Sequence, residues 1–331
     1  MFKGFERYKK WVAILALPYL LVVAMFTVRI DYRIYAPGGL NPVGNFIEFE
    51  TPYPSQNPLS TTYIMNVEEP TAFQYFVGKA ISSLSVSKLP ESRQNISDSA
   101  SFESGQVSRN TSVDLALINA YQALGLIIDY ETEFIVSLYY EYMDADTLDI
   151  GDIILEVNES EAVLDTLGDV ACEESATLKV RKDNGDLMSA SITRQQIDDA
   201  CRFGLRISTY YRITEAEIPY TLKDSPIGGP SGGLMQTLYI YNALTQKDLT
   251  KDTQIAGTGT IRIDGSVGSI GGVREKIITA QKGGVDVFFV PSGKNHEDAL
   301  NALSQLRTPT VEIVAVDTFD EALEYLRGGT S

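Results

Sequence analysis

One glycine-rich stretch of the sequence holds a serine whose surroundings suit nucleophilic chemistry. The stretch is Gly228–Met235, reading Gly-Gly-Pro-Ser-Gly-Gly-Leu-Met, and its serine is Ser231. Small neighbours leave the hydroxyl open to a bulky substrate, and a helix predicted over 231–244 places the serine beside unpaired backbone N–H groups. Such donors suit the negative oxygen that develops when a carbonyl is attacked. The stretch therefore indicates a serine nucleophile, although a glycine-rich turn into a helix is also a common structural feature.

A second glycine-rich stretch, Gly271–Lys276, offers a base for that serine. A lysine acts as a base near pH 7 only where its amine is neutral. The helix predicted over 273–282 puts Lys276 in its first turn, where the helix macrodipole opposes positive charge and lowers the pKa. Apolar residues on one side of that helix also place the lysine close to desolvated surface. The pattern favours a Ser231/Lys276 dyad, while a lysine at such a position can also simply be exposed.

A histidine base is the alternative. Gly229-x-Ser231-x-Gly233 formally matches the nucleophile elbow of α/β-hydrolases, with Asp286 and His296 following in the order of a Ser-Asp-His triad. However, His296 begins a polar predicted helix, where a solvated or capping role is the ordinary one. The segment before Ser231 also lacks a well-formed strand. We therefore favour the lysine over the histidine.

Together the two stretches resemble the peptidase domain of Lon-type proteases. In that family a G-P-S-A-G turn carries the nucleophile and a G-G-(hydrophobic)-x-x-K segment carries the base. Ser231 and Lys276 are 45 positions apart, which is close to the family's interval, and Ala256–Gly259 matches the family's threonine-bearing strand. The resemblance covers about 204–327. It departs from the family at Gly228, where many ATP-dependent members have an acidic residue, and at Gly232, where the family has alanine.

The resemblance implies roles for the residues around the dyad. Thr258 would hydrogen-bond the lysine, and the turn formed by Gly229, Pro230 and Gly232 would support the oxyanion. The implied reaction is acyl transfer, with no metal and no cofactor. Lon-type domains often form rings, so the resemblance also allows a homo-oligomer.

Composition excludes some partners. A net charge of −17 argues against a nucleic-acid ligand, because phosphate recognition needs a basic face. No G-x-x-x-x-G-K-[ST] loop occurs, so no nucleotide is expected. The two cysteines, Cys172 and Cys201, lack the spacing of a metal site, and the sequence leaves open whether they pair.

The N-terminus predicts a membrane anchor. Basic residues among the first ten precede an uncharged apolar run over 11–28, which rises about 27 Å as a helix and just matches a bilayer core. The basic side places residues 1–10 in the cytoplasm and everything after Arg29 outside. A cleaved signal peptide is the alternative, but Ala24–Phe26 is a poor cleavage site.

The rest of the chain divides by its patterns. We predict a linker over 29–60, a strand over 61–67, a mobile polar loop over 91–110 and a helix from an N-cap at Thr111 to Gly125. Short strands follow over 126–194, and strands alternate with helices from 204 onward. That alternation predicts an α/β (α+β) domain.

Within the strand-rich part, Leu148–Asn158 resembles the signature of a PDZ domain, the alternative being an unrelated small β-domain. The order of anchor, PDZ-like insert and Lon-like end resembles the YlbL-type membrane-anchored PDZ/Lon-like proteases. This implies a cytoplasmic tail (1–10), a transmembrane anchor (11–28), a linker with the first part of the Lon-like domain (29–115), a PDZ-like domain (116–202) and the proteolytic part (203–331).

The function we expect is that of an ATP-independent serine endopeptidase. It would be held in the cell membrane by a single span, with its catalytic domain extracellular. Its substrates would be exported or membrane-tethered proteins or peptides, captured by the PDZ-like domain through added strands. The alternative is a non-catalytic adaptor at the cell surface, in which the PDZ-like domain binds peptides and the Lon-like part is structural.

Overall fold

The structure, a computed structural model, describes residues 5–50, 52–54, 57–145, 147–161, 163–251 and 253–328 of the 331-residue chain. The chain forms two compact units. One consists of residues 1–38 and 64–94, and the other of residues 39–63 and 95–331. The first four residues of the predicted cytoplasmic tail lie outside the described ranges.

The first unit is built from α1 (Phe5–Thr27), α2 (Ala72–Ala80), β4 (Ser85–Lys88) and the start of β1 (Tyr32–Pro42). β1 and β4 pair antiparallel. Thr71 caps α2 through a reciprocal capping box with Gln74, and Phe26 of α1 stacks on Phe73 of α2 with ring centroids 4.6 Å apart.

The sequence predicts a membrane-spanning anchor over 11–28, and the structure places all of that stretch except Val28 in α1. Among the described residues, none of the helices combines the length and the apolar character needed to cross a bilayer.

Two predictions about the segments after α1 were wrong. The region predicted as a linker contains β1, a 3-10 turn (Val43–Asn45) and β2 (Ile47–Phe49), because these segments have partners far along the chain: β2 pairs with β12 (Tyr220–Leu222). The region predicted as a mobile loop forms the first half of a long helix, α3 (Asp98–Leu124), which Ser97 caps. Its serines and asparagines are weak helix formers, and tertiary contacts override that weak preference.

The second unit contains a parallel sheet in the order β17, β16, β13, β3. These strands are Glu312–Val316, Val287–Pro291, Ile255–Gly257 and the first residues of Ser60–Glu68. α6 (Val273–Lys282) connects β13 to β16, and α7 (Lys294–Ser304) connects β16 to β17. The predicted alternation of strands and helices is confirmed here, with α6 at its predicted bounds.

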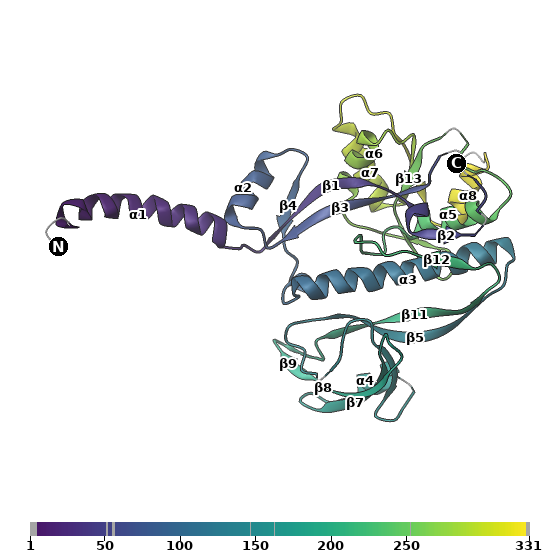
Figure 1. The fold of residues 1–331 in the computed structure, drawn as a ribbon, viewed down its shortest axis with the longest axis horizontal. Helices are drawn as coiled ribbons and strands as arrows, with labels where there is room; N and C mark the ends of the chain where they lie inside the picture. The colour runs from purple at the N-terminus through teal and green to yellow at the C-terminus, as the bar shows by residue number, and fades with distance from the viewer. Residues whose placement is uncertain are drawn as a thin grey trace. The chain divides into compact units, whose positions relative to one another are not determined.

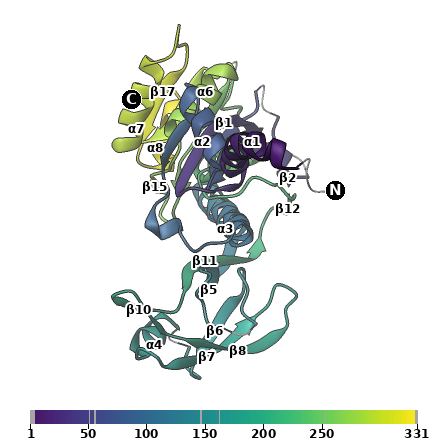
Figure 2. The same ribbon diagram turned by 90° about the vertical axis from the view of Figure 1, so that its left-hand side faces the viewer.

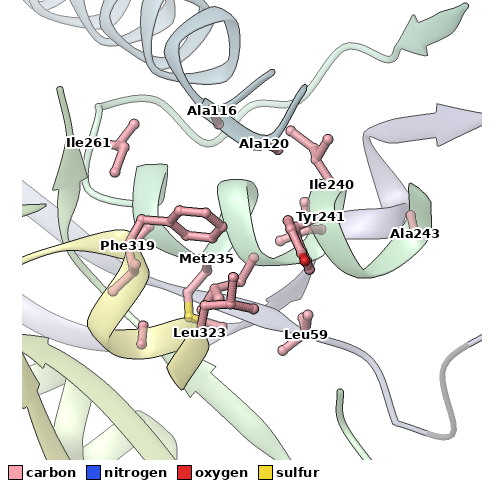
Figure 3. Packing of buried hydrophobic residues seen from close by; sticks show 14 of the residues in the cluster. Leu59, Ala116, Ala120, Met235, Ile240, Tyr241, Ala243, Ile261, Phe319 and Leu323 are labelled. Atoms are coloured by element: carbon pink, nitrogen blue, oxygen red, sulfur yellow. The ribbon is translucent and has the colours of Figure 1, made fainter. Parts of the chain in front are cut away.

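Alternate residues of β16 face two different cores. Phe288 packs with Val273 and Ile277 of α6, whereas Phe289 packs with residues of α5 (Gly233–Leu244) and α8 (Phe319–Leu326). Figure 3 shows this second core, with Met235 of α5 among its members. The sheet therefore lies between two helical layers, and the strand ends are fixed from both faces.

α3 lies between α5 and the ribbon formed by β5 (Ile128–Tyr139) and β11 (Leu205–Ala216) in Figure 1, and Figure 2 also shows β11 and β5 below α3. Small residues on its α5 side, Ala116 and Ala120, are fully buried and allow the two helices to approach closely (Figure 3). α3 ends at Gly125 and leads directly into β5 (Ile128–Tyr139).

The strand-rich part is an antiparallel sheet in the order β11, β5, β6, β7, β8 with a core of its own. After β5 its strands are Ile153–Val157, Ser175–Arg181, Leu187–Thr193 and Leu205–Ala216, and α4 (Val163–Asp169) packs on β6. A short hairpin, β9 (Gln195–Ile197) with β10 (Ala200–Arg202), joins β8 to β11. Cys172 and Cys201 form a disulfide, which answers the question that the sequence left open.

Candidate active site

Ser231 lies in the turn that enters α5, and backbone bonds tie this turn to the segment after β13. The N–H of Gly259 donates to the carbonyl of Ser231 at 2.8 Å, and the N–H of Leu234 donates to the carbonyl of Gly259 at 3.1 Å. A Cβ at Gly233 would lie 2.7 Å from the backbone nitrogen of Ile261, so only glycine fits there. The glycine-rich sequence thus allows a close approach of backbone to backbone. Ser231 itself remains partly exposed.

Lys276 reaches Ser231 from the other side of the sheet. It is the fourth residue of α6, and only 2% of it is exposed. Its Nζ lies 2.9 Å from Ser231 Oγ, 2.9 Å from the carbonyl oxygen of Thr62 on β3, and 3.0 Å from Thr258 Oγ1 beyond β13. The structure therefore brings together the serine, the lysine and the threonine that the sequence singled out, from three separate segments.

Burial sets the charge state of this amine. Desolvation lowers the pKa of Lys276 from 10.5 to about 7, because removal from water penalises the charged ammonium. Of the two causes expected from the sequence, the helix macrodipole and desolvation, desolvation is the one that acts here. A large fraction of the amine is consequently neutral at physiological pH.

The hydrogen bonds around the amine fit its neutral form. A neutral amine has two hydrogens and one lone pair. The Thr62 carbonyl can only accept, and Thr258 donates its own hydroxyl hydrogen to the Ser231 carbonyl at 3.0 Å, so its oxygen is left to accept from the lysine. These two bonds use both amine hydrogens. The lone pair then faces Ser231 Oγ and can accept its proton, which is the geometry of a general base.

The turn around Ser231 offers two N–H groups for an oxyanion. In the described part of the chain, neither the Ser231 nor the Gly232 N–H donates to a protein acceptor. The other predicted supporters are less suited, since Pro230 has no N–H and the Gly229 N–H already donates to the Gly105 carbonyl at 2.7 Å. An oxyanion site here would therefore use Ser231 and Gly232.

The triad alternative is not assembled. His296 lies in the first turn of α7, and within the described ranges no hydrogen bond joins it to Ser231. Asp286 accepts instead from the Gln254 N–H at 2.9 Å. No strand runs directly into Ser231 either, because β12 ends at Leu222. Among the residues that the structure describes, no group of three or more His, Cys, Asp or Glu side chains could hold a metal ion.

Sequence reasoning missed two contributors. The Thr62 carbonyl is a backbone group, which no residue pattern reveals. The second is Ser112 of α3, which is buried beside the nucleophile turn. Its hydroxyl contacts Pro230 and Gln236, both more than 110 positions away in the sequence. Nothing in the sequence pattern singled this serine out.

Comparison with known proteins identifies the family. The model of the Lon protease (S16) C-terminal proteolytic domain matches residues 134–327, more than half of the chain. The chain therefore belongs to the family of Lon proteolytic domains and is a serine peptidase. The matched stretch includes most of the predicted PDZ-like segment and delimits no separate domain within it.

Individual relatives agree with the family. The Lon protease of Campylobacter concisus is 29% identical over 191 residues, 56% of this chain and 23% of the relative. That of Campylobacter jejuni is 37% identical over 101 residues, 30% of this chain and 12% of the relative. That of Clostridioides difficile is 31% identical over 115 residues, 35% of this chain and 14% of the relative. The matches thus span less than a quarter of the length of these relatives.

Proposed function

We propose that the chain is an ATP-independent endopeptidase in which Ser231 is the nucleophile and Lys276 the general base. The observation that carries this is the 2.9 Å contact between Ser231 Oγ and a buried amine whose pKa is lowered to about 7. Neutral Lys276 takes the hydroxyl proton as Ser231 attacks the peptide carbonyl. The protonated lysine then gives that proton to the leaving amine, and water releases the acyl-enzyme.

The surrounding groups support both charged species of this reaction. The N–H groups of Ser231 and Gly232 are placed to donate to the oxyanion. The ammonium that forms on Lys276 would keep two acceptors, the Thr62 carbonyl and the Thr258 hydroxyl. Every group in this scheme comes from residues 62–276 of this chain. The ATP-independent part of the proposal is supported by the sequence, in which no G-x-x-x-x-G-K-[ST] loop occurs.

For substrates we propose exported proteins or peptides, met outside the cytoplasm. The Cys172–Cys201 disulfide supports an oxidising location, because disulfides persist mainly in exported proteins. We further propose that the strand-rich part is a PDZ-like domain that captures an extended peptide as an added strand. Its support is the Leu148–Asn158 signature, together with a hydrophobic core separate from those of the parallel sheet.

Variants of three residues test the mechanism. Ser231→Ala and Lys276→Ala should each fold, as judged by circular dichroism, and lose cleavage of a peptide library, whereas His296→Ala should keep it. Cleavage that survives both dyad variants would refute the dyad mechanism, whereas a wild-type chain that binds peptides without cleaving them would favour the adaptor function. Loss in His296→Ala alone would favour the triad. Proteomics of exported proteins from cells with the active and Ser231→Ala forms would then identify the substrates.

A further inference from the structure

One side of α3 contacts the loop over 223–230, which connects β12 to Ser231. Gly105 and Arg109 are one helical turn apart and share this side. The Gly105 carbonyl accepts the N–H of Gly229 at 2.7 Å, and the Arg109 guanidinium donates to the carbonyl of Lys223 at 3.0 Å. Arg109 is only 8% exposed and stacks over the ring of Phe46, so this anchor is fixed in place.

Ser112, on the next turn of the same side, extends these contacts to the nucleophile turn itself. Its hydroxyl lies 3.2 Å from the carbonyl of Pro230, the residue before Ser231, and 3.0 Å from the side-chain oxygen of Gln236 in α5. Only 2% of Ser112 is exposed. Gly105, Arg109 and Ser112, which we call the α3 stripe, therefore contact the loop at three successive points up to its catalytic end.

The loop reaches the α3 stripe only because one of its residues has no side chain. A Cβ at Gly228 would lie 2.8 Å from the carbonyl carbon of Gly105 and 3.0 Å from its Cα, both backbone atoms of a helix. The reverse contact is ordinary, since a Cβ at Gly105 would lie 3.6 Å from Gly228 Cα. The steric requirement for glycine thus falls on Gly228. This is the position where many ATP-dependent Lon-type proteases have an acidic residue.

α3 is rigidly placed, so a clash at Gly228 would move the loop rather than the helix. The Asn119 side chain donates to the carbonyl of Arg262 at 2.9 Å, and Tyr121 is fully buried with its hydroxyl bonded to the carbonyl of Ile218. α5 packs on one side of the helix and β5 on another. The loop, in contrast, is irregular between β12 and α5 and exposed at Gly228.

We propose that Gly228 is a positioning residue for the reaction, and that the α3 stripe is the surface against which it places the nucleophile turn. The proposal rests on the proposed function of Ser231. In place of an acidic side chain, this chain uses a backbone-to-backbone contact to hold the turn three residues before the nucleophile. A side chain at 228 would push the turn off α3 and move Ser231, together with its oxyanion donors, relative to Lys276 Nζ.

Gly228→Ala tests this, with Gly168→Ala as the matched control. Gly168 lies in α4, where an added Cβ would meet no atom within 4 Å, and it is far along the chain from the site. For Gly228→Ala we expect kcat on a short peptide to fall on the order of 100-fold, as a misplacement of about 1 Å can cause. KM should stay within about threefold and the midpoint of the pH profile should not move, because Lys276 keeps its surroundings. Gly168→Ala should match the wild type.

Ser112→Ala adds a second perturbation of the same turn. If both residues act on it, the double variant should lose less than the product of the two single losses, because effects that share one structural cause are not additive. Full multiplicative loss, or a change confined to KM, would contradict a shared positioning role.

Hydrogen exchange at the Gly229 amide gives a measure that does not depend on activity. Its bond to the Gly105 carbonyl should protect it in the wild type and in Gly168→Ala, and Gly228→Ala should speed its exchange on the order of tenfold. Protection that persists in Gly228→Ala, or a wild-type kcat in that variant, overturns the proposal. If the wild-type protein shows no Ser231-dependent cleavage, the proposed function is refuted instead. The exchange measurement would still show whether Gly228 is needed for the hydrogen bond between the Gly229 N–H and the Gly105 carbonyl.

Discussion

Replacing Lys276 by methionine should make the fold more stable, and by an amount that depends on pH. The folded state holds the amine with a pKa of about 7, against 10.5 in water. Between these values the unfolded chain binds more protons than the folded chain, so the free energy of unfolding rises with pH across this window. Below pH 7 the full cost of burying the ammonium is present, and it fades as the pH approaches 10.5.

The size of the effect follows from the pKa shift. At about 1.4 kcal/mol per pKa unit, the cost in the wild type is about 5 kcal/mol at pH 6 and about 2 kcal/mol at pH 9. Lys276→Met removes this cost at every pH. It also leaves the Thr62 carbonyl and the Thr258 hydroxyl without their donor, a loss that does not change with pH. The stability advantage of the variant should therefore shrink by about 3 kcal/mol between pH 6 and pH 9, whatever its absolute value.

Urea unfolding followed by circular dichroism at several pH values measures this directly. Lys282→Met is the matched control, because Lys282 ends the same helix and is exposed. Its difference from the wild type should stay within about 0.5 kcal/mol at every pH. A Lys276→Met advantage that stays constant from pH 6 to pH 9 would show that the amine is not titrating near neutrality in the folded state. The general-base assignment would then lose its physical basis.

Three further predictions concern the site and the strand-rich part. First, kcat/KM should rise with pH through about 7 as Lys276 loses its proton, and Thr258→Val should lower kcat on the order of tenfold by removing an acceptor of the amine. Second, replacing both Cys172 and Cys201 by serine should lower the free energy of unfolding by about 3–4 kcal/mol, given their separation of 29 residues, and a reducing agent should cause the same loss in the wild type. Third, burial raises the pKa of Asp114 from 3.8 to about 7, so urea unfolding should show Asp114→Asn gaining stability over the wild type from pH 4 to pH 7 and no more above it.

Local sequence patterns correctly predicted the elements that are determined by residues close to them in the sequence. The bounds of α6 follow from the glycines before and after it and from its helix period, all within a few positions. The closeness of Ser231 to Lys276 could also be expected, but from resemblance to a family and not from periodicity. Nothing in the spacing of 45 residues dictates a 2.9 Å contact, which exists because α5 and α6 lie against opposite faces of one sheet.

The failures share a different cause. Residues 98–110 lack helix-forming strength and amphipathic period, and they form the first half of a helix that packs on α5, β5 and β11. β1 and β2 were missed because their partners, β4 and β12, stand about 50 and 170 positions away. These strands form because of long-range pairing, and a single sequence does not reveal which distant segments pair. The same holds for the α3 stripe, which lies largely in the segment that was predicted to be a loop.

The location of the dyad explains why a sheet with helices on both faces suits this chemistry. A neutral lysine needs burial, while a nucleophile needs access, and the two atoms must still be within one hydrogen bond of each other. Lys276 obtains its burial from α6 packed under the sheet, where Val273 and Ile277 lie in a closed core. Ser231 obtains its access from the turn above the strand ends, with Thr258 between them. The Lys276 side chain extends from the buried α6 layer to Thr258, just after β13, where its Nζ reaches Ser231. The packing of the two hydrophobic cores therefore offsets the free-energy cost of desolvating this amine, and the residues of the site do not have to.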